Sequence, residues 1–465
     1  MKWIAGVILA LCAPASAFAQ SFETTPGAGF NSLNHAGRPA GENSRGVTLG
    51  DFVLHPGLAV GGGYNTNVFY EDSTEGTEPA GALQVVPSLR LVTPDPRMFR
   101  LKSNLQIRWE RLFSDLEEVT SQSGVDVLAD LGVQIAPRGI ISFTIYDIFR
   151  RYLDSPSAPS DQGQNSIYNE IGGIFGFHPG GADRTSRRGF SGTIGVGYGI
   201  QRYDEQLELD RSLFMSRLQA FYHFLPKTAI RLSLSYQSIS YDTTVRTTDV
   251  EGDDALSQAL AEAFDGVLVN TDSTPFRATL GIGGLLTRWL DFGLDAGYTM
   301  AGYSSGEDFS SWVANASLGF FLTPDARVGI EWSRGFSDSS FANYYTYNRF
   351  AADARYLAGA WTFNLSGSFE QREFATVTVP VLETGAGGEV PLYSTADRVD
   401  PVIGGRFFIG YNINDMLRVS GSYQLSANLT DFVVTTGRSS GPDRPNSSAS
   451  QYVRHEFFIS TEFEY

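Results

Sequence analysis

Apolar and polar side chains alternate along the last segment of this chain. One set of alternate positions is largely apolar: Val453, His455, Phe457, Ile459, Thr461, Phe463 and Tyr465. The intervening set is largely charged: Arg454, Glu456, Phe458, Ser460, Glu462 and Glu464. A period of two places each set on its own face of a β-strand. The pattern therefore predicts a strand with one apolar face and one polar face.

The same alternation recurs along most of the chain after residue 50. Further examples are Phe99–Trp109, Leu290–Tyr298, Val328–Trp332 and Leu417–Leu425. We predict about 18 such strands, with 16 as the alternative count, because strand boundaries read from sequence carry an error of two to four residues.

The connections between these strands alternate between short and long. Short ones lie near residues 93–96, 136–138, 225–227, 286–288, 323–325 and 412–415, with 178–188 a longer member of that set. Long ones lie near residues 65–82, 112–122, 153–165, 243–273, 375–395 and 431–449. Together these six long connections hold 20 of the 51 Asp and Glu residues but only 3 of the 34 Lys and Arg. Short turns on one side and longer loops on the other are typical of a transmembrane barrel.

The first 19 residues have the features of a secretory signal peptide. Lys2 gives a positive start, Ile4–Leu11 is apolar, and Ala17-Phe18-Ala19 forms a cleavage site before Gln20. The chain's single cysteine, Cys12, lies inside this segment. A mature chain without cysteine excludes disulfides, thiol catalysis and cysteine-ligated metal sites. A soluble secreted protein is the alternative interpretation.

Composition favours one large membrane barrel. The chain has 50 Gly, 21 Tyr and 33 Phe, a mean hydropathy of −0.13, and no apolar run long enough for a transmembrane helix. A soluble propeller or sandwich array would need a repeat of roughly 40–50 residues, and none is visible. We therefore predict an all-β chain: a signal peptide (1–19), a flexible periplasmic segment (20–50) and a transmembrane antiparallel up-and-down β-barrel (51–465). It would lie in the bacterial outer membrane with both termini in the periplasm.

The inward face of these strands supplies the candidate pore-lining residues. They are Arg100, Lys102, Arg108, Glu110, Asp126, Asp130, Arg217, Arg231, Asp291, Asp295, Arg327, Glu331, Arg406, Arg418 and Arg454. Two interpretations stay open. The charges could pair with one another and stiffen the wall, or the guanidinium groups could contact carboxylates, phosphates or sulfates of a permeating solute.

Several features resemble other kinds of site only weakly. Two G-x-S-x-G sequences, Gly302–Gly306 and Gly437–Gly441, fall in predicted hairpin loops rather than at the strand-to-helix turn of a nucleophile elbow. The five histidines show no metal-ligand spacing. A pI near 4.7 argues against nucleic-acid binding. We therefore expect no enzyme, cofactor or metal, although an outer-membrane lipase, protease or acyltransferase stays open as another class.

The longest connection contains a helical pattern. Leu256, Leu260, Ala263 and Phe264 have helical spacing within Asp254–Gly266. This segment predicts a short amphipathic helix, either at the mouth of the barrel or packed on neighbouring loops.

A family resemblance adds a more specific expectation. Arg45–Gly57, continued by Gly63–Phe69, resembles the first strand of the beta-barrel porin 2 family, in which an entry segment ending in Pro precedes a strand that closes on a Tyr-x-x-Asn-Val-like sequence. The C-terminal aromatic, Tyr465, resembles the signal that leads outer-membrane barrels to their assembly machinery. The family resemblance implies an outer-membrane channel for exopolysaccharide that works with a periplasmic export protein.

The sequence thus predicts a channel for hydrophilic solutes, most specifically a polysaccharide-export conduit. Its surroundings would be outer-membrane lipid and lipopolysaccharide. A general diffusion porin, or a non-conducting structural or adhesive barrel with acidic surface loops, is the alternative function.

Overall fold

The structure is a computed structural model that describes most of the chain after residue 45. It describes residues 46–70, 77–94, 98–152, 165–179, 189–204, 210–242, 271–304, 308–338, 344–375, 377–385, 388–396, 398–430, 433–435, 447–449 and 451–465. The predicted signal peptide, nearly all of the predicted periplasmic segment, and the predicted helix at Asp254–Gly266 lie outside these residues.

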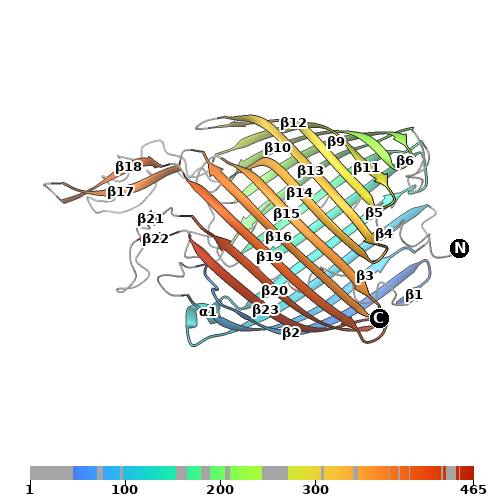
Figure 1. Ribbon diagram of the computed structural model, residues 1–465, viewed down its shortest axis with the longest axis horizontal. Coiled ribbons are helices and arrows are strands. Elements are labelled where there is room, and N and C mark those ends of the chain that lie inside the picture. The colour runs from blue at the N-terminus through green and yellow to red at the C-terminus, as the bar shows by residue number, and fades with distance from the viewer. Residues whose placement is uncertain are drawn as a thin grey trace.

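Eighteen antiparallel strands form a closed barrel (Figure 1). They are β2 (Phe52–Asn65), β3 (Ala80–Val92), β4 (Phe99–Phe113), β5 (Gly124–Ile135), β6 (Ile141–Tyr152), β7 (Ser166–Phe177), β8 (Gly189–Tyr203), β9 (Arg211–Leu225), β10 (Thr228–Tyr241), β11 (Ser273–Thr287), β12 (Leu290–Tyr303), β13 (Phe309–Thr323), β14 (Ala326–Asp338), β15 (Tyr344–Ala358), β16 (Trp361–Phe374), β19 (Val399–Asn412), β20 (Leu417–Asn428) and β23 (Tyr452–Glu464). Each strand pairs with the next along the sheet, and β23 pairs with β2 to close it. The predicted up-and-down barrel is confirmed.

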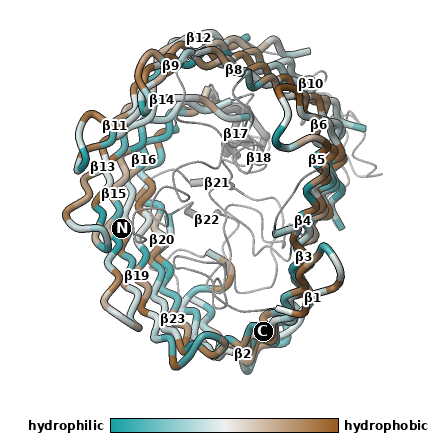
Figure 2. The backbone as a smooth tube through the Cα atoms, turned by 90° about the vertical axis from the view of Figure 1, so that its right-hand side faces the viewer, coloured by the Kyte–Doolittle hydropathy of each residue, from teal (hydrophilic) through white to brown (hydrophobic). Residues whose placement is uncertain are grey.

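Alternation between the two faces explains why these segments form strands. On β23, Phe457 and Ile459 are exposed on the outside, at 51% and 70%, whereas Glu456, Phe458 and Ser460 between them are buried. Figure 2 shows the same alternation of apolar and polar residues around the barrel. The predicted division of this strand into an apolar outer face and a polar inner face is confirmed.

Long and short connections lie at opposite ends of the barrel. The long ones carry two further hairpins, β17–β18 (Val377–Gly385 and Gly388–Ala396) and β21–β22 (Val433–Thr435 and Ser447–Ala449) (Figure 1). The sequence pattern had assigned both hairpins to loops. At the short-connection end, β1 (Val47–Leu49) pairs with the start of β2. There the backbone N–H of Tyr465 donates to the carbonyl of Pro56 at 3.0 Å.

Helix is almost absent from the described residues. The helix α1 (Glu117–Ser121) lies in the connection between β4 and β5. No helix in the described part of the chain is both long and apolar enough to cross a membrane.

A small apolar core lies inside the barrel, against the seam where it closes. Val68 and Val119 come from two long connections and are fully buried. They belong to one cluster with inward-facing strand residues, namely Ala80, Ala82, Val86, Leu112 and Phe458. The first two long connections therefore pack onto the inner wall beside the seam.

Glycines on the inner face of β2 make room for this core. A Cβ at Gly63 would overlap the Phe458 ring and the carbonyl oxygen of Phe457, whereas a Cβ at Gly62, on the outer face, would lie 3.7 Å from its nearest neighbour. β23 can therefore approach β2 this closely only because residue 63 is a glycine and has no Cβ.

This geometry predicts opposite outcomes for two adjacent substitutions. Gly63→Ala overpacks the seam and should destabilise the barrel by about 1–3 kcal/mol. Gly62→Ala is the matched control and should leave stability nearly unchanged. Denaturant unfolding of the purified barrel measures both. Equal stability of the two variants would show that the seam does not depend on Gly63.

Candidate functional site

All fifteen residues predicted to line a lumen lie on the inward face of the barrel. Residues directly opposed across antiparallel strands share a face, and the strand registers are consistent around the whole wall. By strand they are Arg100, Lys102, Arg108 and Glu110 on β4, Asp126 and Asp130 on β5, Arg217 on β9, Arg231 on β10, Asp291 and Asp295 on β12, Arg327 and Glu331 on β14, Arg406 on β19, Arg418 on β20 and Arg454 on β23. Their role in permeation stays a prediction.

Many of these charges neutralise one another. Arg231 forms a two-point ion pair with Asp295, with Nε donating to Oδ1 at 3.0 Å. Arg327 lies between Asp291 and Asp353, at 3.4 and 3.8 Å. The structure thus brings together predicted residues from strands two apart, which local sequence spacing does not reveal.

Pairing on the opposite part of the wall follows the same rule. Arg108 forms an ion pair with Asp126, and Asp130 accepts a hydrogen bond from Arg150 at 2.6 Å. Gln84 donates to Glu110. These contacts favour the first of the two open interpretations for this part of the wall, a mutually paired polar lining.

Ion pairs near the seam are deeply buried. Arg398 donates to Asp400 through both Nε and Nη2, the latter at 2.6 Å, and Asn428 adds a bond to the same carboxylate at 3.2 Å. The Asp400 side chain is 1% exposed. Arg454 likewise pairs with Glu456, and both are buried. Such a carboxylate is costly to bury without its partner.

Carboxylates and guanidinium groups on the inward face differ in how completely they are paired. Each of these strand carboxylates has a hydrogen-bond donor or a cationic nitrogen within 4.0 Å among the described residues: Glu110, Asp126, Asp130, Glu170, Asp291, Asp295, Glu331, Asp353, Glu370, Asp400, Glu456, Glu462 and Glu464. Within the described residues, Arg277, Arg349 and Arg355 have no carboxylate at ion-pair distance. The lining therefore carries an excess of available positive charge.

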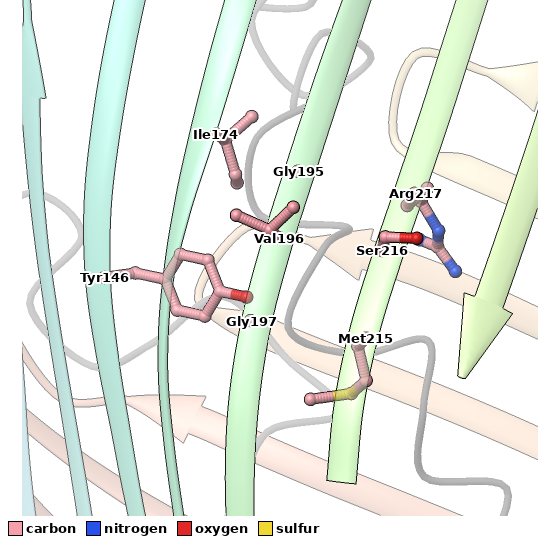
Figure 3. A pocket seen from close by; sticks show the side chains of 8 residues that line it. All are labelled: Tyr146, Ile174, Gly195, Val196, Gly197, Met215, Ser216 and Arg217. Carbon is pink, nitrogen blue, oxygen red and sulfur yellow. The ribbon is translucent and has the colours of Figure 1, made fainter. Parts of the chain in front are cut away.

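A shallow hollow in the inner wall was not predicted from the sequence. Its lining includes Tyr146, Ile174, Gly195, Val196, Gly197, Met215, Ser216 and Arg217 (Figure 3). The Tyr146 ring reaches over Gly172 and its hydroxyl reaches Gly197, where side chains would collide with it. The hydroxyls of Tyr146 and Tyr168 donate to the buried Glu170 at 2.7 and 2.6 Å.

The glycine pattern on β8 was the available signal for this hollow. Gly195, Gly197 and Gly199 alternate on the inward face of this strand. Alternate glycines leave space that large side chains from neighbouring strands occupy. They should therefore have suggested aromatic neighbours.

Among the described residues, no group of three or more His, Cys, Asp and Glu side chains could hold a metal ion. His178 follows β7, and burial lowers the pKa of its imidazole. The G-x-S-x-G sequence Gly302–Gly306 lies partly outside the described residues, and Gly437–Gly441 lies wholly outside them.

Comparisons with known proteins find similarity in fold only. No family model matches the chain, and no curated protein is similar to it in sequence. The family resemblance of the first strand thus has no support beyond its own residues.

Solved structures similar to this chain include two proteins that are described as transport proteins or receptors and one that is described as an outer-membrane protein. The FrpB iron transporter from Neisseria meningitidis is 7% identical with a TM-score of 0.46, covering 88% of this chain and 81% of that one. The outer membrane protein OpdK from Pseudomonas aeruginosa is 8% identical with a TM-score of 0.44, covering 89% and 99%. The siderophore receptor PirA from Acinetobacter baumannii is 9% identical with a TM-score of 0.45, covering 89% and 80%. Their ligands cannot be transferred to this chain at such values.

We predict that breaking a buried ion pair lowers the free energy of unfolding more than breaking an exposed one. Arg398→Leu leaves the Asp400 carboxylate buried without its cation and should cost about 3–5 kcal/mol of unfolding free energy. Arg202→Leu breaks the Arg202–Asp242 pair, which is 2.6 Å long and about 40% exposed, and should cost at most about 1 kcal/mol. Equilibrium unfolding of the two variants measures the difference. A cost for Arg398→Leu no larger than that of the control would contradict the buried-pair account.

Proposed function

We propose that this barrel lies in the bacterial outer membrane and is a channel for hydrophilic solutes. The observation that carries the proposal is the wall with two unlike faces. Large apolar side chains are exposed all around the outside, among them Ile459 at 70%, Leu280 at 60% and Leu365 at 57%. A continuous apolar surface of this extent marks contact with lipid or protein rather than with water.

Aromatic residues support the membrane location. Exposed aromatic side chains near the short-connection end include Phe99, Phe190, Tyr222, Tyr356, Trp361 and Tyr411. A second set nearer the long connections includes Tyr64, Trp109, Tyr198, Tyr298, Trp312 and Phe350. Two aromatic girdles bounding an apolar band are the pattern of an outer-membrane barrel.

Charged residues on the outer face are consistent with that band. On the described strands they lie in the half of each strand next to the long connections, namely Arg111, Asp147, Arg151, Arg202, Arg334 and Glu373. Hydrocarbon excludes such groups, whereas the polar headgroup region accepts them. Outer-membrane lipid and lipopolysaccharide are therefore the proposed surroundings, with the long connections outside the cell.

The polar inner face supports a path for hydrophilic solutes. Many charged groups on this face are paired within the wall, and others, such as Lys102, Arg349 and Arg355, are exposed to the lumen. An interior of this kind holds water and excludes apolar molecules. We do not extend the proposal to catalysis.

Polysaccharide export is the more specific form of the proposal. It is supported only by the resemblance of residues 45–69 to the beta-barrel porin 2 family, and it implies a periplasmic export protein as partner. The assembly machinery would recognise β23. General diffusion of small solutes is the second form, and it needs no partner.

Two experiments test the channel and then its cargo. In planar bilayers the purified full chain should give stepwise conductance, because water-filled barrels conduct ions. Deletion of the gene should then abolish surface polysaccharide while uptake of small solutes is unchanged.

Three results would count against these statements. A well-folded barrel that never conducts would refute the channel and leave a structural or adhesive barrel. Slowed solute uptake with normal surface polysaccharide would replace export by diffusion. If deletion of the gene changes neither surface polysaccharide nor the uptake of small solutes, both proposed cargoes are refuted.

A further inference from the structure

Three arginines gather on the inner wall between β9 and β15. Ser235 on β10 is paired with Arg217 on one side and with Arg277 on the other. Both arginines therefore project from the same level of the inward face, about 10 Å apart at the backbone. Their like charges repel each other.

Tyr347 connects this pair to a third cation. A Cβ at Gly335 on β14 would collide with the hydroxyl of Tyr347. The Tyr347 side chain therefore lies across Gly335, on the side of β15 that faces β11 and Arg277. The charges of Arg277, Glu370 and Arg349 all act on Tyr347. Arg277, Tyr347 and Arg349 thus face one part of the lumen.

Small side chains form the floor between these residues. Thr299 is paired with Arg277 across β11 and β12, and it is fully buried. Val313 on β13 is 1% exposed. The wall there contributes no large or charged side chain of its own, so the arginines and Tyr347 define the chemistry of this surface.

Two carboxylates, Glu370 and Glu170, lie beside the three arginines, so the group keeps a net positive charge. Glu370 is the cross-strand partner of Arg349, but it accepts a hydrogen bond from Arg372 at 2.7 Å. The charge of Glu170 acts on Arg217, and this carboxylate also accepts hydrogen bonds from two tyrosine hydroxyls. In the described part of the chain, Arg277 and Arg349 have no carboxylate within ion-pair distance, in contrast to Arg231 and Arg327.

We propose that Arg277, flanked by Arg217 and Arg349 and assisted by the hydroxyl of Tyr347, binds an oxyanion group of a solute in the lumen. Guanidinium groups bind carboxylate, sulfate and phosphate through paired hydrogen bonds. An anion between like charges also removes their repulsion. The inference rests on the proposed function, because a solute reaches this site only through the lumen. It narrows the transported solutes to acidic ones, including acidic polysaccharide.

Sulfate binding to the detergent-solubilised full chain tests this site. Equilibrium dialysis with labelled sulfate at low ionic strength should find one bound equivalent. Arg277→Gln and, separately, Arg217→Gln should each weaken binding at least tenfold. Arg355→Gln is the matched control, because it removes the same charge from an arginine of the inner wall outside this group, and it should change affinity less than twofold.

Two outcomes would overturn the site. Equal weakening by Arg355→Gln would show a diffuse positive field instead of a site, and unchanged binding in both Arg277→Gln and Arg217→Gln would show that sulfate binds elsewhere or not at all. The result is separable from the channel proposal. A barrel that binds sulfate as expected but never conducts refutes only the channel, whereas one that conducts without binding sulfate refutes only the site.

Competition experiments then distinguish the two sources of an oxyanion. Glucuronate oligomers that displace sulfate much better than free glucuronate, at equal carboxylate concentration, assign the site to an acidic chain. Equal displacement assigns it to single small acids. Failure of both to displace sulfate would refute the extension of the site from sulfate to carboxylate solutes.

Discussion

The fold depends on hydrogen bonding of the backbone within a closed sheet. In hydrocarbon, an unpaired peptide group has no water to bond, so only helices and closed barrels are stable there. Pairing of β23 with β2 removes the two edges that an open sheet of this size would expose. Once the sheet closes, each strand must present one face outward and the other inward. The alternation in the sequence is the direct consequence.

The inner wall follows from this constraint. Polar and charged side chains are confined to a limited interior, so they approach one another and form pairs such as Arg231–Asp295 and Arg327–Asp291. Where large side chains come from neighbouring strands, glycines such as Gly63 and Gly197 give them space. The group around Arg277 departs from this rule, because its positive charge exceeds the negative charge beside it. That departure is the basis for assigning it a ligand.

The architecture could be predicted from the sequence because it depends on local periodicity. The faces of β4 and β23, and the inward position of all fifteen candidate residues, follow from a period of two and need no knowledge of which strands are neighbours. The partners of those residues depend on register between strands. For this reason Arg108 could be placed on the inner face, while its pairing with Asp126 and the contacts of Tyr146 and Tyr168 with Glu170 could not be anticipated. The hairpins β17–β18 and β21–β22 were missed because they lie beyond the barrel wall, in segments that the regular spacing of wall strands had assigned to loops.

Contact between the outer face and lipid chains is the central claim, and tryptophan fluorescence tests it most directly. Of the six tryptophans, Trp3 lies in the predicted signal peptide. Trp109, Trp312, Trp332 and Trp361 lie on the outer face of strands, and Trp289 lies in the turn between β11 and β12, half exposed. In vesicles of phospholipid brominated along the acyl chains, most of the emission should be quenched relative to unbrominated vesicles. Unquenched emission from a folded protein that stays dissolved without detergent would contradict the account.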